Sequence, residues 1–239
     1  MTMTQSKDLR IPLSKVVLGK LGQQLRGVKR ALFPTMVVPR VPLLRSVRKQ
    51  LKAMARLQYR DDVLGHRMYL DAEDSLDLSW NQDYEPCETR FCLSQLRDGD
   101  VALDIGANIG YYTLLFARRV GPRGHVFAFE PEPSNFALLT KNVQLNGYTN
   151  VTLVNKAVSD TNGRLRLFLS MGNNADHRVY DSQDGRHSVE VESVRLDDHF
   201  AGFSRAINFI KMDIQGAVLP AAQGMTSLLQ KNPDVVLVA

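Results

Sequence analysis

The sequence contains little cysteine, no long apolar run and almost no acid in its first quarter. Its 239 residues include two cysteines, Cys87 and Cys92, which lie five positions apart on an expected helix. They would therefore occupy different helix faces, and we expect no disulfide between them. No cysteine and histidine spacing fits a zinc site. No apolar stretch approaches the roughly 18 residues of a membrane span, and the N-terminus lacks the apolar core of a secretory signal. We expect a cytoplasmic protein.

The charge is unevenly distributed. Residues 1–60 contain 14 lysines and arginines and one acid, a net charge of +13, whereas residues 61–239 carry 16 basic and 24 acidic residues, a net charge of −8. We expect a basic, proline-interrupted extension over residues 1–63 and a mildly acidic domain over residues 64–239. The extension has two stretches of helical apolar spacing. It either contacts an anionic membrane or an acidic partner, or it docks loosely on the domain. No aromatics alternate with its basic residues, so no nucleic-acid partner is expected.

Beyond residue 64, strand patterns alternate with helix patterns. Strands are expected at HRMYLD, VALDI, HVFAFE, NVTLVN, INFIKMDI and PDVVLVA, and helices at EPCETRFCLSQL, IGYYTLLFARRV, PSNFALLTKNVQLN and GAVLPAAQGMTSLLQ. Ser134 is the expected N-cap of the third helix, and Gly147 lies past its end. GRLRLFLS and SVEVESVRL alternate with period two on either side of a polar loop over residues 171–187. This order predicts an α/β fold with a doubly wound, Rossmann-like parallel sheet.

The stretch LDIGANIGYY forms a Gly-rich turn between an expected strand and an expected helix. A phosphate-binding P-loop requires a lysine that this stretch lacks. A dinucleotide loop has glycine where Asn108 stands, and Asp104 would repel a pyrophosphate. S-adenosylmethionine (SAM) is cationic and carries no phosphate, so Asp104 suits it, directly or through the loop. Glu130, at the end of the next strand, could accept both ribose hydroxyls. A turn that binds no ligand is the remaining alternative.

The run DIGANIGYYTLLFARRVGPRGHVFAFEPEPSNFALLTKNVQLNG resembles the FkbM family of SAM-dependent methyltransferases. YEP, NVTLVNKAVSD, NNADHRVY, VRLDD and IKMDIQGAVLPAAQGM resemble further segments of that family in the same order. The resemblance implies a class I methyltransferase fold, SAM as the methyl donor and a hydroxyl of a small molecule or sugar as the acceptor. The cofactor-binding residues that it implies are Asp104, Gly106, Ala107, Asn108, Gly110, Glu130, Pro131, Ala157 and Val158.

A hydroxyl acceptor must lose its proton, so we expect a base or a metal-bound oxygen. Asp213 is the first candidate, because carboxylates at the ends of parallel strands face the crevice; its alternative role is to orient the SAM loop. His177 in the polar loop is either a base held over the site or a solvated histidine, and Asp176 beside it is a further candidate. Glu85 either takes part or caps the helix that begins at Pro86. We identify no metal ligands.

Two features depart from the family. The family usually reads DxEGAE where this chain reads DIQGAV, so Gln215 and Val218 replace acids, and glutamine can neither carry charge nor act as a base. A class I sheet normally continues past PDVVLVA with a helix and two strands, which would cover an otherwise unpaired edge. We expect a truncated product or an edge covered by a partner. A monodisperse, cooperatively melting monomer would contradict truncation.

Three functions compete on these grounds. The leading hypothesis is an enzyme, a SAM-dependent O-methyltransferase. The second is a catalytically impaired or truncated SAM-fold binding protein, which Gln215, Val218 and the short C-terminus favour. The third is a nicotinamide-dependent oxidoreductase, against which Asp104 and Asn108 argue.

Overall fold

The computed structural model describes residues 60–71, 74–78, 81, 83–170, 175–181 and 183–239. Apart from residues 60–63, the expected basic extension and its two helical stretches lie outside the described residues. Strand β1 (Arg60–Val63) precedes the expected domain start and pairs antiparallel with β2 (His66–Met68). No helix in the described part of the chain is long and apolar enough to cross a membrane.

The large sheet has five strands in the order β10-β9-β3-β4-β5, all paired in parallel. These strands are β3 (Val101–Ile105), β4 (His125–Phe129), β5 (Val151–Val154), β9 (Phe209–Met212) and β10 (Val236–Val238). The chain moves outward from β3 to β5 and then returns to the other side of β3 as β9. This order confirms the doubly wound sheet. It also places the topological switch point, where such sheets bind ligands, between β3 and β9.

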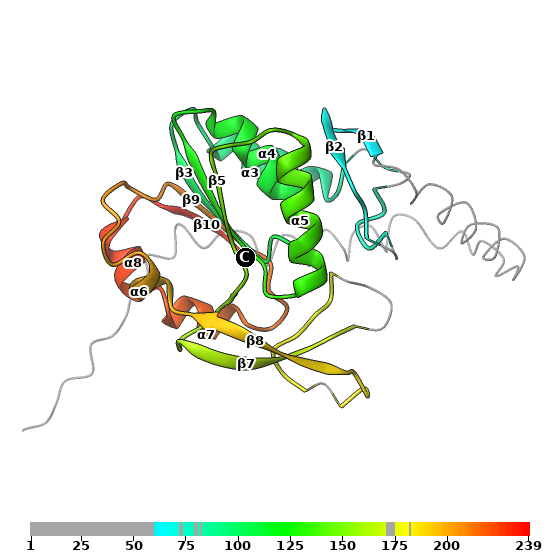
Figure 1. The fold of residues 1–239 in the computed structure, drawn as a ribbon. Helices are drawn as coiled ribbons and strands as arrows, with labels where there is room; N and C mark the ends of the chain where they lie inside the picture. Colours follow the sequence, from blue (N-terminus) through cyan, green and yellow to red (C-terminus); the bar gives the residue numbers. More distant parts are fainter. Residues whose placement is uncertain (1–59, 72–73, 79–80, 82, 171–174, 182) are drawn as a thin grey trace, which may run out of the picture.

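Helices cover both faces of this sheet (Figure 1). On one side lie α3 (Pro86–Gln95), α4 (Tyr111–Val120) and α5 (Pro133–Leu145), and on the other lie α6 (Leu196–His199), α7 (Val218–Gln223) and α8 (Thr226–Lys231). The residues of β3 contribute to two separate hydrophobic cores. Ala102 packs into one of them, whereas Leu103 and Ile105 pack into the other. All five residues of β3 are buried, which explains its nearly continuous apolar sequence.

A small sheet lies across the carboxyl ends of the large one (Figure 1). Its order is β6-β8-β7, formed by β6 (Ala157–Val158), β7 (Gly163–Phe168) and β8 (Ser188–Val194). The antiparallel pairing of β7 with β8 confirms the two alternating strands expected from the sequence. Strand β6 was not expected, because two residues are too few to show a period. The polar loop between β7 and β8 is joined to the sheet at a bridge of Phe168 with Arg178.

The expected single helix at GAVLPAAQGMTSLLQ is wrong, because two helices, α7 and α8, occupy this stretch. The Asp197 carboxylate accepts hydrogen bonds from the first backbone N–H groups of α8, including that of Leu228 at 2.8 Å. In a continuous helix these N–H groups would donate to carbonyl oxygens of the preceding turn. They are available to Asp197 because the helix is interrupted before α8. The break falls at Gly224, where a Cβ atom would lie 1.9 Å from the Ser159 carbonyl oxygen.

The start of α5 also differs from the prediction. Its N-cap is Glu132, whose side chain accepts a hydrogen bond from the Asn135 backbone N–H at 2.6 Å. Ser134 lies inside the helix, because Pro133 takes the first helical position, where its missing N–H is not needed. Gly147 follows the helix as expected, with a φ of 70°.

Candidate active site

The Gly-rich loop connects β3 to α4 and is held against two neighbouring strands. The N–H groups of Gly106 and Ala107 both donate to the Phe129 carbonyl oxygen at the end of β4, at 2.9 Å. Gly106 has a φ of 83°, and a Cβ atom there would lie 2.2 Å from the carbonyl oxygen of Asp213. Gly110 also has positive φ and packs closely against α5. Glycine at position 106 therefore allows the loop to lie directly on the end of β9, and glycine at position 110 allows its close packing against α5.

Asn108 occupies a left-handed conformation, with a φ of 50°. Asparagine tolerates this region better than most residues. Its side-chain oxygen accepts a hydrogen bond from the Ile109 N–H at 2.7 Å, and its own N–H donates to the Glu130 carboxylate at 2.8 Å. Asn108 therefore shapes the loop, which is a reason for its presence where a dinucleotide-binding loop has glycine.

Glu130 follows β4 and lies buried at the edge of the loop. One carboxylate oxygen accepts from the Asn108 N–H and the other from the Glu132 N–H at 2.9 Å. Burial raises the pKa of Glu130 to about 7, although these two hydrogen bonds oppose the shift. Each carboxylate oxygen can accept a further hydrogen bond. Glu130 can therefore hold the loop and a diol at the same time.

Asp104 lies beneath the loop. It is 1% exposed, and its carboxylate accepts a hydrogen bond from the Thr113 hydroxyl of α4. Burial raises the pKa of Asp104, against the opposing effects of Lys211 and Thr113. Of the two roles open to it, direct contact with a cofactor or an action through the loop, this position favours the second.

A cavity opens between the carboxyl ends of β3 and β9, with a volume of about 590 Å³ when its open mouth is included. The expected site residues that line it are Gly106, Asn108, Glu130, Pro131, Ala157, Val158, His177 and Asp213. The expected residues Ala107, Gly110, Asp104 and Glu85 are not among its lining residues. Four further lining residues, Asn135, Lys156, Leu167 and Val179, were not predicted from the sequence. Leu167 and Val179 come from the small sheet and its loop, whose position no local motif indicates.

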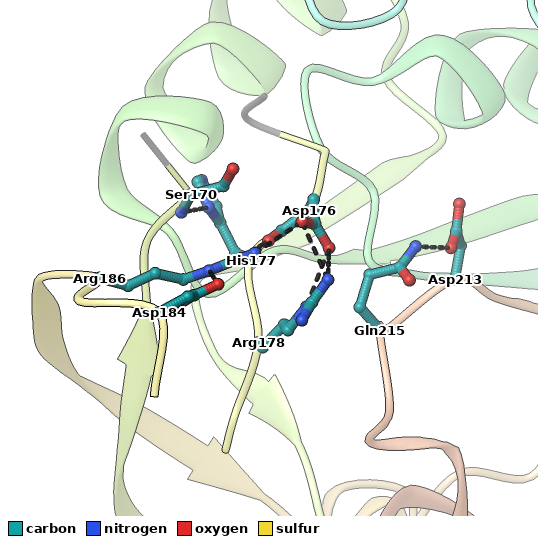
Figure 2. A network of polar contacts seen from close by, with 8 residues as sticks. All are labelled: Ser170, Asp176, His177, Arg178, Asp184, Arg186, Asp213 and Gln215. Atoms are coloured by element: carbon teal, nitrogen blue, oxygen red, sulfur yellow. Dashed lines mark hydrogen bonds and ion pairs between the residues drawn. The ribbon is translucent and has the colours of Figure 1, made fainter. Parts of the chain in front are cut away.

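Asp213 lies at the cavity wall directly after β9, with its side chain 40% exposed. The Gln215 amide donates a hydrogen bond to one Asp213 oxygen at 3.3 Å, as Figure 2 shows, and the Lys211 ammonium lies 3.6 Å from the other. An ionised glutamate at position 215 could not donate this hydrogen bond. The departure from DxEGAE therefore replaces a charged neighbour of Asp213 with a donor.

His177 lines the cavity from the polar loop (Figure 2). Its Nδ1 accepts a hydrogen bond from the Ser170 backbone N–H at 3.1 Å, which leaves the proton of the neutral ring on Nε2. Burial lowers the pKa of His177, so the ring is neutral at pH 7. In this arrangement Nε2 is a donor, and the structure does not support the expected role of His177 as a base.

Asp176 holds the polar loop together. Its carboxylate accepts from Arg178 Nε at 3.0 Å and from Arg186 Nη2 at 2.9 Å (Figure 2). Burial alone would raise the pKa of Asp176, but the two arginines outweigh it and lower the pKa. These two ion pairs occupy both carboxylate oxygens, so Asp176 connects Arg178 to Arg186 within the polar loop.

Glu85 precedes α3 in a left-handed conformation, and its side chain makes no capping hydrogen bond. Glu85 therefore occupies the N-cap position without a side-chain cap, and it is not among the residues that line the cavity. Within the described residues, no group of three or more histidine, cysteine, aspartate or glutamate side chains is arranged to hold a metal ion. Cys87 and Cys92 are both free thiols, as expected.

Two family profiles match the chain. The profile described as "Methyltransferase FkbM domain" matches residues 104–238, more than half of the chain. The profile described as "Protein-L-isoaspartate(D-aspartate) O-methyltransferase" matches residues 29–162. The two overlap over residues 104–162, which contain the end of β3, the Gly-rich loop and strands β4 and β5. Only the first covers β9 and Asp213, on the other side of the cavity.

The chain is similar to "Hexuronic acid methyltransferase AglP" of Haloferax volcanii, with 30% identity over 67% of this chain and 63% of the relative. It is also 30% identical to "31-O-demethyl-FK506 methyltransferase FkbM" of Streptomyces tacrolimicus, over 51% of this chain and 57% of that one. The chain therefore spans less than two thirds of the length of either relative.

A solved structure of methyltransferase FkbM from Methylobacillus flagellatus covers 80% of this chain and 47% of its own, with 16% identity and a TM-score of 0.39. The strand order of the large sheet carries the fold assignment without that likeness. The profile covers more than half of the chain, and the chain belongs to the Methyltransferase FkbM domain family.

Proposed function

We propose that this protein transfers a methyl group from SAM to a hydroxyl oxygen of a saccharide or another small molecule. One observation carries the proposal: the cavity at the switch point is lined by Gly106, Glu130 and Asp213 together. The names of the two curated relatives, which specify a hexuronic acid and 31-O-demethyl-FK506, support a saccharide or small-molecule acceptor.

The lining of the cavity fits SAM. Gly106 leaves room where a side chain would fill the approach to β9, and the Glu130 carboxylate can accept hydrogen bonds from the ribose hydroxyls. Phe129, Val158 and Leu167 provide an apolar wall for a flat adenine ring. When bound, SAM supplies an electrophilic methyl group. The chain's contribution is to hold donor and acceptor in line, which can account for a large part of the rate.

Asp213 is the group we assign to the acceptor's proton. Its carboxylate lies on the cavity wall, across the switch point from the cofactor loop, and is held from both sides by Lys211 and Gln215. An Asp213 oxygen would accept the proton that the acceptor hydroxyl loses, while SAM, when bound, would supply the methyl group and leave as its demethylated product. His177 Nε2 can donate a hydrogen bond to the acceptor from the opposite loop.

The second candidate is a protein that binds SAM without turnover. Gln215 favours it, because it removes one acid from the acceptor side of the cavity. Both candidates predict binding of S-adenosylhomocysteine (SAH), the product that remains after methyl transfer. Only the first predicts a methylated acceptor.

The experiment is transfer of a labelled methyl group from SAM to a panel of hexuronic acids, neutral sugars and macrolide alcohols. We expect a methylated hydroxyl on at least one of them. The variant Asp213→Asn should lower kcat by roughly 10²- to 10⁴-fold, the usual contribution of a general base, and leave the KM for SAM nearly unchanged. Binding of SAH with no transfer to any acceptor would favour the second candidate.

We also propose a cytoplasmic location, supported by the two free thiols. The extension over residues 1–63 would contact an anionic membrane surface or an acidic partner through its basic residues. Cell fractionation of the full chain and of a chain lacking residues 1–59 checks both statements. Loss of membrane or partner association only in the shorter chain is the expected result.

A further inference from the structure

A lysine is buried beside the cavity, and no motif of the sequence draws attention to it. Lys211 lies on β9 with its side chain 3% exposed. Its ammonium nitrogen is 3.6 Å from the Asp213 carboxylate and 3.7 Å from the carboxylate of Glu88 on α3. It also lies 4.2 Å from the ring centroid of Tyr112 on α4, within the range of a cation–π contact.

Asp104 is the residue directly opposite Lys211 in the pairing of β3 with β9. It holds the Thr113 hydroxyl at the first turn of α4, next to the Gly-rich loop. Lys211 therefore lies between the carboxylates of Asp104 and Asp213. Asp104 lies beneath the cofactor loop, and Asp213 lies on the acceptor side of the cavity.

The charge of Lys211 is maintained by these neighbours. Burial lowers the pKa of Lys211, but Asp213, Asp104 and Glu88 outweigh it, so the pKa lies above its ordinary value. Burial also raises the pKa of Cys92 on α3 to about 12, so this thiol is neutral.

Tyr112 is neutral for the same reason, since burial raises its pKa. Within the described part of the chain, the groups that act on Lys211 are therefore three carboxylates, a neutral thiol and a neutral phenol.

An apolar side chain of similar length would fill this space without a buried charge. Buried ion pairs are often no more stabilising than hydrophobic replacements, so stability alone is a weak reason to keep a charged lysine here. The position between a carboxylate under the cofactor loop and one at the cavity wall points to a role in the site.

We propose that Lys211 is a positioning residue for the methyl transfer: its ammonium holds the Asp213 carboxylate at the cavity wall and balances Asp104 beneath the cofactor loop. The inference rests on the proposed function, because it assigns a role within the same site. Lys211 itself contacts neither donor nor acceptor in this assignment.

Removal of the ammonium has a consequence that depends on pH. Without Lys211, the ordered loop buries Asp104 with no cation beside it, so the ordered state favours a protonated Asp104. Ligand binding that orders the loop would then take up a proton, and affinity would fall as pH rises. In the wild-type protein Lys211 opposes the rise in the pKa of Asp104, so this proton uptake is smaller.

The test uses titration calorimetry with SAH on the full chain, as wild type, Lys211→Met and the double variant Asp104→Asn with Lys211→Met. Arg164→Gln is the matched control, because it removes a cation from an exposed ion pair with Glu190. Affinities are compared as ratios to wild type at each pH between about 6 and about 8.5. Glu130 titrates in all of these proteins, so its effect largely cancels in the ratio.

We expect Lys211→Met to bind SAH about tenfold more weakly at the alkaline end and to approach wild type at the acidic end. The double variant should lose this pH dependence, and Arg164→Gln should match wild type throughout. With an acceptor from the panel above, the double variant should keep a kcat about tenfold below wild type, because Asp213 is no longer held. A wild-type kcat in the double variant would contradict the part of the proposal that concerns Asp213.

A Lys211→Met ratio close to one at every pH would overturn the inference. If Lys211→Met does not fold, the double variant decides: pH-independent binding near wild type supports the inference, and a pH-dependent loss overturns it. Failure of the wild-type chain to bind SAH would instead overturn the proposed function, and this inference with it. The two failures are distinguishable because only the second appears in the wild type.

Discussion

At the scale of single residues, the Gly-rich loop is determined by how closely its backbone approaches the neighbouring strands. Gly106 combines a positive φ with a carbonyl oxygen so near that no side chain fits. Asn108 and Glu130 then fix the loop through one backbone N–H and one carboxylate oxygen. These contacts shape the loop, and each of them can be tested separately.

The variant Gly106→Ala should lower the free energy of unfolding by roughly 2–5 kcal/mol, because it adds φ strain of about 1–2 kcal/mol to overpacking of about 1–3 kcal/mol. Gly147→Ala is the matched control. Gly147 has a similar φ of 70° but open surroundings, so only the strain should appear. Urea denaturation of both variants measures the difference, and equal losses would contradict the close approach of the loop to β9.

Glu130→Gln should weaken SAH binding roughly 10- to 100-fold, because hydrogen bonds to a charged group contribute about 1.5–3 kcal/mol each. In the wild type, the pKa of about 7 means that the accepting carboxylate is lost by protonation as pH falls through 7. Wild-type affinity should therefore decline on acidification, whereas the variant should show a flat profile. Glu190→Gln, an exposed carboxylate, is the control. Calorimetry at several pH values measures both, and a flat wild-type profile would argue against Glu130 as the ribose acceptor.

At the scale of elements, one buried amide connects the segment after β2, the loop and α5. The Asn142 side chain donates to the carbonyl oxygens of Ile109 at 2.7 Å and Tyr69 at 3.0 Å, and accepts from the Tyr69 N–H at 2.6 Å. This amide therefore couples an N-terminal segment to the cofactor loop.

The variant Asn142→Leu keeps the volume and leaves these buried backbone groups unpaired, so we expect a loss of about 2–4 kcal/mol in the free energy of unfolding. Asn146→Ala, one helical turn later, removes two exposed hydrogen bonds to Arg67 and one to the Asn142 carbonyl oxygen and leaves no fully buried group unpaired, so it should lose less than Asn142→Leu. Chemical denaturation of both variants checks the ranking. A smaller effect at Asn142 than at Asn146 would contradict the assigned connection.

Elements with a strong period were predictable, and those whose ends depend on distant residues were not. The strand from Val101 and the helix from Tyr111 follow apolar spacing that local sequence shows directly. The break between α7 and α8 depends on the carboxylate of Asp197, about 30 residues earlier in the chain. No local pattern could reveal it.

At the scale of the whole molecule, the site forms where the large sheet meets the small one. The loop after β3, Glu130 after β4 and Asp213 after β9 were predictable, because the carboxyl ends of parallel strands meet at one edge of the sheet. The small sheet and its loop add Leu167, Val179 and the Nε2 of His177, and their arrival depends on the pairing of β7 with β8. Lys211 was hidden inside an apolar strand pattern.

The central claim is that this cavity binds the methyl donor rather than a nicotinamide dinucleotide. Titration calorimetry of the wild-type chain with SAH, and separately with NAD, tests it most directly. We expect saturable binding of SAH at a single site, weakened in Glu130→Gln, and no binding of NAD. Binding of NAD in the absence of SAH binding would contradict it.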